Sequence, residues 1–209
     1  MTTSTKQTPM LLPVTSVALN DWNTKRAQRI ALSWGVHATL AAPPRAIWHA
    51  DQALAMVAQR ISTEFQGFAR ALHDEAIDVF VSHVGGANMP LESVLRERMT
   101  TERALSKGNP TKKALGGDFG RLGFTFWAAM QKADGRANAW GQELDKLIEM
   151  RNGVAHDDEA KLNRLHSEGY PLASGTLQKW EKDLGDIAAT MDDVVASSLS
   201  ALLKIQRPW

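Results

Sequence analysis

A long stripe of apolar residues between Trp48 and Val84 constrains the fold more than any other feature of the chain. Its members recur at steps of three to five residues, which is the spacing of one face of an α-helix. They are Leu54, Val57, Ile61, Phe65, Phe68, Leu72, Ile77 and Phe80. Gly85 and Gly86 follow the stripe and end the helix. The sequence therefore predicts one long amphipathic helix whose apolar face needs other helices to cover it.

A second apolar stripe runs from Leu177 to Leu202 and is closed by Pro208. Three shorter helical patterns lie between the two stripes, and Pro90 suits the first turn of the earliest of them. The last of the three runs from about Ala137 to His156. No segment of the sequence alternates apolar and polar residues between hairpin turns, as a strand would. The predicted fold class is all-α, a helical bundle with two long amphipathic helices.

Prolines divide the chain into two parts. Pro43 and Pro44 cannot extend a preceding helix, so residues 1–43 are expected to form an N-terminal extension. Its first dozen residues are rich in Thr, Ser and Gln and are predicted to be disordered. One short helix is expected between Val17 and Leu40, with Lys25, Arg26 and Arg29 on its exposed face. Residues 44–209 are predicted to form a single helical bundle domain.

Composition excludes several classes of function. The chain has 209 residues, 44% of them hydrophobic, and a formal net charge of +1, so the surface is not basic overall. Zero cysteines exclude disulfides, thiolate metal sites and a cysteine nucleophile. No apolar run is long enough for a membrane span, and the first residues do not form a secretory signal. A cytoplasmic protein without membrane contact is the default expectation.

A polar hexad, Arg151-Asn152-Gly153-Val154-Ala155-His156, stands at the end of the helical pattern that begins near Ala137. Asn152 and His156 are four residues apart and therefore lie on one face of a helix. Arg151 lies roughly 140° around the helix from His156. Its long side chain can wrap part of that distance, or it can serve a site that a second copy of the helix completes.

The hexad suits RNA cleavage without a metal ion. That reaction needs a base near the ribose 2′-hydroxyl, a cation over the phosphate and an acid for the leaving 5′-oxygen. A histidine such as His156 suits the proton transfers, and the planar fork of Arg151 suits the phosphate. Asn152 can orient the imidazole or the phosphate, while Asp157 can fix the tautomer of the ring. The alternative is structural: Asn152 and Gly153 begin to unwind the helix, and His156 contacts its last carbonyl groups.

These residues resemble a known family. The R-N-x-x-x-H motif late in an all-helical domain is similar to the HEPN superfamily of small helical bundles, many of which are metal-independent ribonucleases. The segment from Glu64 to Glu75 resembles the long first helix of its bacterial ribosome-linked and phage-defence branch. The resemblance spans about residues 44–209. It implies the catalytic roles above for Arg151, Asn152 and His156, and a site formed between two protomers.

A local excess of positive charge precedes the motif helix. Between Lys107 and Arg136 the sequence has six cations and two anions. The segment from Ser106 to Lys113 has turn chemistry and no apolar period, so it is expected to be an exposed, mobile loop. Its lysines are candidates for binding RNA phosphate. They are Lys107, Lys112 and Lys113.

A metal site is a competing interpretation of His49 and of the pair His73-Asp74. If the first stripe is one helix, His49 and His73 lie about 36 Å apart and cannot share an ion. No metal ligands are therefore predicted. His73 and Asp74 are expected on the flank of the long helix, either exposed or supporting the hexad.

The sequence as a whole predicts a metal-independent endoribonuclease that cleaves RNA through a 2′,3′-cyclic phosphate and needs no cofactor. The expected partners are RNA, a second copy of the chain in a homodimer, and an antitoxin or other protein. The context implied by the resemblance is a toxin–antitoxin or phage-defence system. The alternative is a non-catalytic helical dimerisation or interaction module that keeps the same fold.

Overall fold

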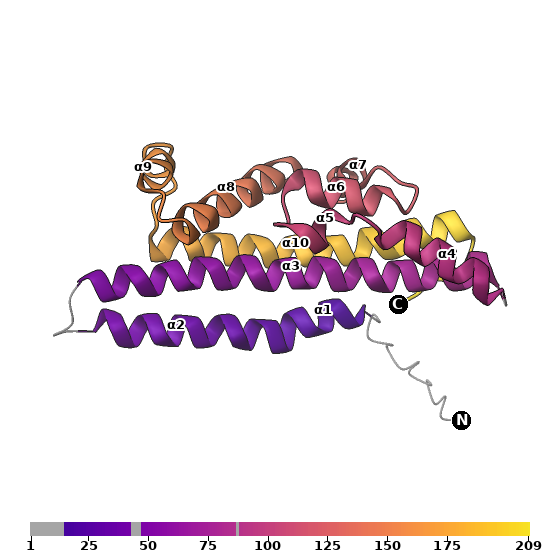
Figure 1. The fold of residues 1–209 in the computed structure, drawn as a ribbon, viewed down its shortest axis with the longest axis horizontal. Coiled ribbons are helices and arrows are strands. Elements are labelled where there is room, and N and C mark those ends of the chain that lie inside the picture. The colour runs from indigo at the N-terminus through magenta and orange to yellow at the C-terminus, as the bar shows by residue number, and fades with distance from the viewer. Residues whose placement is uncertain (1–14, 43–46, 87) are drawn as a thin grey trace, which may run out of the picture.

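The chain folds into a bundle of helices (Figure 1). The structure, a computed structural model, describes residues 15–42, 47–86 and 88–209, and no strand occurs in these ranges. The helices are α1 (Val17–Asp21), the π-helical turn η1 (Trp22–Arg26), α2 (Ala27–Ala41), α3 (Ile47–Gly85), α4 (Met89–Thr100), α5 (Ala104–Lys107), α6 (Lys112–Gly120), α7 (Phe126–Ala133), α8 (Ala137–Ala155), α9 (Glu159–Ser167) and α10 (Ser174–Leu203). The predicted all-α class with two long helices, α3 and α10, is confirmed.

The helix ends follow from local chemistry. Gly86 adopts a positive φ of 58° directly after α3, a conformation that glycine tolerates. Asn88 caps α4 by accepting a hydrogen bond from the Leu91 N–H, and Pro90 lies in its first turn. The motif helix α8 has the bounds that the sequence predicts, to within one residue. A turn at Gly169 then leads into α10.

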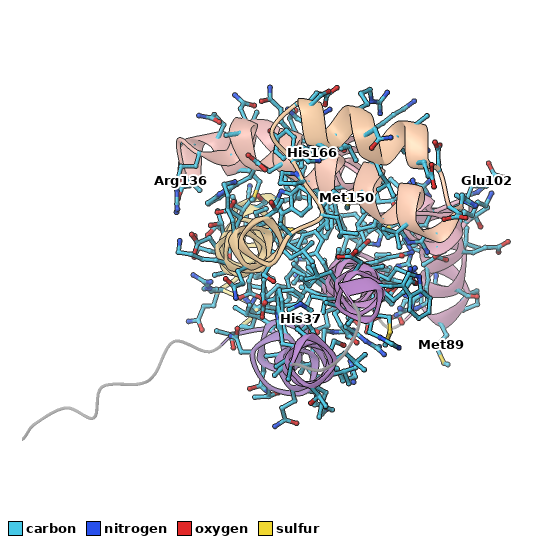
Figure 2. All side chains as sticks on the ribbon, turned by 90° about the vertical axis from the view of Figure 1, so that its left-hand side faces the viewer. His37, Met89, Glu102, Arg136, Met150 and His166 are labelled. Carbon is cyan, nitrogen blue, oxygen red and sulfur yellow. The ribbon has the colours of Figure 1, made fainter. Side chains whose placement is uncertain are left out.

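The long helices α3 and α10 lie side by side in the middle of the molecule (Figures 1 and 2). On one side α1 and α2 run along α3, and on the other side α6, α7 and α8 cover the pair. The core lies between these layers. Phe65, Phe68 and Leu72 of α3 are fully buried there, together with Leu147 of α8 and Ile187 of α10. The long stripe on α3 thus contacts helices on both sides.

The segment before the prolines differs from the prediction of one short helix. Residues 17–41 are helical throughout and pack along α3. Arg26 and Arg29 are turned toward Glu64, whose side chain is only 4% exposed, at 3.1 Å and 2.7 Å. A buried carboxylate needs a cation, and Arg26 is half-buried as a result, whereas Lys25 and Arg29 are exposed, as the sequence predicts. The predicted disorder of the first dozen residues and the break at Pro43-Pro44 lie outside the described residues.

Three short helices, α5, α6 and α9, have no counterpart in the sequence prediction. α5 occupies the start of the expected loop, and α6 begins at Lys112, so only residues 108–111 connect them. α9 was missed because its apolar pattern is weak, with Leu165 as its one buried residue. No helix in the described ranges is long and apolar enough to cross a membrane.

Candidate functional site

A polar cleft of about 610 Å³ lies at the carboxyl end of α8. It is bounded by α3, α5, the residues after α5, α8 and α9. The residues lining it are Gln66, Ser106, Lys107, Gly108, Asn109, Arg151, Asn152, His156 and Lys161. Three of these carry a permanent positive charge, and none of the described residues that line the cleft is an aspartate or glutamate. The cleft is therefore suited to an anion.

The three motif residues all line this cleft within one chain. The Arg151 Nη1 donates a hydrogen bond to the Asn152 Oδ1 at 3.1 Å, which brings the guanidinium around the helix toward the Asn152 face. Arg151 and Asn152 are half-buried, whereas His156 is exposed. Of the two explanations that the helical offset left open, this geometry corresponds to the one in which the arginine wraps the helix.

Asn152 is held by a residue that the sequence did not single out. The Asn109 Nδ2 donates to the Asn152 Oδ1 at 3.0 Å, so this oxygen accepts from both Asn109 and Arg151. The Nδ2 group of Asn152 is left to donate elsewhere. Asn152 is thus oriented as a donor, which matches the phosphate-orienting role better than that of an acceptor.

The connection at residues 108–111 is fixed to the bundle, contrary to the expected mobile loop. The Gln66 Nε2 donates to the Leu105 O at 3.1 Å and to the Gly108 O at 2.6 Å. The Lys112 N–H donates to Asp145 at 2.8 Å. Pro110 is buried. The cleft wall that carries Asn109 is therefore tied to both α3 and α8.

The end of α8 follows the Schellman pattern. His156 is the C-cap, and Asp157 has the positive φ of 52° that usually falls to glycine at this position. The Asp158 N–H donates to the Gly153 O at 2.8 Å. Asp157 is exposed and lines a separate cleft, on which Asp51 and Glu159 also lie. The structure therefore does not bring Asp157 to the imidazole as a tautomer-fixing group.

α9 supplies a second cation opposite the hexad. Asp158 caps α9 by accepting from the Lys161 N–H at 3.0 Å, and its Oδ2 lies 3.0 Å from the Lys161 Nζ. The hydrogen bond from this backbone N–H, followed by one from the Lys161 side chain, lowers the pKa of Asp158. A Cβ on Gly153 would lie 2.8 Å from the Leu162 Cδ2, so the end of the Leu162 side chain would have to shift to admit a larger residue. α9 thus packs closely on α8 and carries Lys161 to the cleft.

The three predicted RNA-binding lysines occupy different places. Lys107 lines the cleft and pairs with Glu102 at 3.2 Å. Lys113 is exposed and lines a neighbouring pocket that shares Lys107, Gly108 and Asn109 with the cleft. The Lys112 ammonium lies over the ring of Trp127, 5.6 Å from its centroid. Only Lys107 joins the motif residues directly.

His73 and Asp74 belong to a separate network. His73 is fully buried, with its Nε2 2.9 Å from the Asp118 O and its Nδ1 3.2 Å from the Arg103 Nη1. Burial lowers the pKa of His73, and the charge of Arg103 adds to this effect. Asp74 pairs with Arg103 as well. In the described part of the chain, neither residue is hydrogen-bonded to the hexad.

The Arg103 network nevertheless positions the start of α5. The Asp118 carboxylate accepts hydrogen bonds from the Ala104 and Leu105 N–H groups at 3.0 Å and 2.8 Å. α5 in turn carries Ser106 and Lys107 into the cleft.

Across the residues that the structure describes, no cluster of three or more His, Asp or Glu side chains could hold a metal ion.

Sequence reasoning missed five of the residues that line the cleft, among them Gln66, Asn109 and Lys161. The three come from elements far apart in the chain, and no local spacing connects them to the hexad.

Comparisons of the chain with family models, curated proteins and solved structures found no match.

Proposed function

We propose that the chain is a metal-independent endoribonuclease, with Arg151, Asn152 and His156 as its catalytic residues. One observation carries the proposal. A permanent cation, an oriented amide and an exposed imidazole meet in one polar cleft whose described lining contains no carboxylate. The resemblance of the hexad to the HEPN motif supports the same assignment. A site lacking carboxylates would neither repel a phosphodiester nor favour a divalent cation.

The proposed reaction is transesterification. The His156 imidazole takes the proton of the ribose 2′-hydroxyl, and the 2′-oxygen forms a bond to phosphorus as the bond to the 5′-oxygen breaks. The imidazolium returns its proton to the leaving oxygen, so the products are a 2′,3′-cyclic phosphate and a 5′-hydroxyl. Arg151 and the Asn152 amide donate to the phosphate oxygens, on which negative charge builds.

The lysines have a supporting role in this proposal. Lys161 and Lys107 attract the phosphate chain, and Lys113 extends the positive surface past Asn109. Lys112 is assigned no RNA contact, because its ammonium lies on the Trp127 ring. A protein partner such as an antitoxin would need only to cover the open cleft to block the reaction.

The test is cleavage of single-stranded RNA in the presence of EDTA, with the 2′,3′-cyclic phosphate end identified by mass spectrometry. His156→Ala and Arg151→Ala are expected to lower the rate by a factor of roughly 100 or more. Each variant has a control that removes the same type of side chain outside the cleft. His166→Ala on α9 matches His156→Ala, and Arg98→Ala on α4 matches Arg151→Ala. Both controls should cleave RNA at the rate of the unmodified protein.

A dependence on divalent metal, or equal losses in the controls, would refute the proposal.

The second candidate is a non-catalytic interaction module, and one observation favours it. The Asn152 Oδ1 serves as a structural acceptor that joins α8 to Asn109. Under this candidate no RNA is cut. Replacing Asn152 by Ala would then lower the free energy of unfolding and change nothing else.

A further inference from the structure

The outer face of α2 is apolar and has no partner in the described part of the chain. α2 packs along α3 on one side (Figures 1 and 2), and its opposite side is an open face lined by Gln28, Ala31, Leu32, Gly35, Val36, Thr39 and Leu40. Leu32 is 71% exposed and Val36 is 42% exposed on this face. Both are large hydrophobic side chains, one turn apart, on a helix that already contributes Ile30 to the core.

The same face lacks charge. From Ala31 to Ala42 the sequence contains no Asp, Glu, Lys or Arg, although 22% of the whole chain is charged. A solvated helix face ordinarily carries such residues. Gly35 lies in the middle of the face, and a Cβ built on it would meet nothing within 4 Å. Packing among the described residues therefore gives no reason for a glycine that costs a helix interior about 1 kcal/mol.

We propose that this face binds a second copy of itself, with two α2 helices packed antiparallel and crossing at Gly35. A two-fold contact places a surface against its own copy, so a charged surface would repel itself and an uncharged one does not. Leu32 and Val36 of one copy pack beside Gly35 of the other. The missing side chain lets the two backbones approach.

Charge at the two ends of α2 fits the antiparallel direction. Arg29 lies six residues before Gly35, and Ala41 lies six residues after it. In a pair that crosses at Gly35, Arg29 of one copy is therefore level with the carbonyl end of the other helix. That end carries the negative pole of the helix dipole and has no basic residue in its last turn. Arg29 is half-exposed even while bound to Glu64.

This contact leaves the candidate cleft open. α2 and the α8–α9 end of the cleft lie on opposite sides of α3 and α10 (Figure 1). The inference does not depend on the proposed ribonuclease activity. It replaces the expected contact between two hexads, whose geometric reason disappears because Arg151 reaches the cleft within one chain. A contact of one helix per copy buries less than about 800 Å² on each side, so we expect association in the micromolar range.

The absence of cysteine makes the test direct. Gly35→Cys places one thiol beside the proposed two-fold axis, and Ala155→Cys places one within the hexad. Val94→Cys, on an exposed site of α4, measures random collisions. Under mild oxidation Gly35→Cys should form a covalent dimer, while the other two variants remain monomeric on a non-reducing gel. Covalent dimers of Ala155→Cys alone would overturn the inference in favour of facing hexads.

Light scattering of the unmodified chain provides the second measurement. A dimer is expected at micromolar and higher concentrations, and the double change Leu32→Glu with Val36→Glu should weaken it by about 100-fold or more. Both side chains are exposed in the monomer, so the variant should keep its helical circular dichroism. Val94→Glu is the matched control and should leave the dimer intact. A monomeric unmodified protein, or a dimer unaffected by the double change, would contradict the inference.

Discussion

Asp157 illustrates how a residue next to a motif can serve the backbone and not the chemistry. It takes the left-handed conformation that closes α8, and it lines a different cleft from the one that holds the hexad. Non-glycine residues adopt this conformation at a cost, although aspartate tolerates it better than most. The position of His156 thus depends on the backbone of Asp157.

Asp157→Gly is expected to raise the free energy of unfolding by about 0.5 to 1 kcal/mol, because glycine removes the strain of the positive φ. RNA cleavage should stay at the level of the unmodified protein. Urea unfolding and the cleavage assay measure the two effects. A loss of activity with intact stability would instead restore the role of Asp157 as the group that fixes the imidazole tautomer.

The buried His73 gives the stability of the fold a pH dependence. Its pKa is lowered in the folded state, so the unfolded chain binds the proton first as the pH falls. Its contribution is complete above about pH 6.5 and is lost as the pH falls toward the folded pKa. Protonation would place an N–H at Nδ1, against the Arg103 guanidinium. Asp118 and Asp74 also face this network.

The free energy of unfolding of the unmodified protein should fall between about pH 7.5 and pH 5.5, and that of His73→Gln should fall less over the same range. Burial raises the pKa of both Glu75 and Asp192, so these carboxyl groups contribute more stability as the pH falls. Their effect cancels between protein and variant. His83→Gln, an exposed change on the same helix, is the control. Parallel pH profiles for all three proteins would disprove the assignment to His73.

At the scale of the elements, α9 packs closely against α8 at Gly153. A Cβ there would overlap the Leu162 Cδ2, so this side chain would have to move to admit one. In another helix, glycine would only weaken the helix. The third position of the hexad thus matters for packing, although the motif leaves it unspecified.

Gly153→Ala is expected to destabilise the fold by about 1 to 3 kcal/mol, because the new methyl group overlaps Leu162. Gly185→Ala in α10 should instead stabilise it by roughly 0.5 to 1 kcal/mol, since a Cβ there meets nothing within 4 Å. Adding Leu162→Ala to Gly153→Ala should recover helix α9 and the cleft. Denaturant unfolding of the four proteins decides the point, and a stabilising Gly153→Ala would show that α9 does not pack as described.

The elements that the sequence could predict are those with strong periodicity. α3, α8 and α10 follow from their apolar stripes, and α4 follows from Gly86 and Pro90. α9 has too few apolar residues to be seen, and the link between Asn109 and Asn152 joins residues that are far apart in the chain. Arg151 was placed by an ideal helical angle, but the reach of its side chain decided its contact. The hexad can therefore be identified from residue spacing in the sequence, whereas the residues that contact it can be identified only from the fold.

At the scale of the whole molecule, the N-terminal helices are part of the core. Trp22 lies between two rings of α3, with its centroid 5.9 Å from Phe65 and 5.7 Å from Phe68. Ser16 and Val17 bind the carboxylates of Asp192 and Glu75 through their backbone N–H groups. Residues 15–41 therefore pack along α3 as far as Glu75.

Trp22→Ala is expected to lower the free energy of unfolding by about 3 to 5 kcal/mol, as for other large core aromatics. Trp48→Ala removes a side chain that is 63% exposed and should change it by less than about 0.5 kcal/mol. Chemical denaturation followed by circular dichroism measures both. Equal, small losses would mean that the N-terminal helices are an appendage and not part of the cooperative unit.

Glu64 determines which of several packings α2 adopts. Two smooth apolar helices can slide past each other by one turn, about 5.4 Å, with little change in buried area. Such a slip would carry Arg26 and Arg29 away from Glu64 and leave its buried carboxylate with Arg60 of its own helix as the remaining ion pair. Arginine hydrogen bonds lower the pKa of Glu64 even though burial alone would raise it, so the charged form is the folded one. One acidic side chain thus selects a single alignment from many nearly equivalent ones, and with it the face of α2 that meets the solvent.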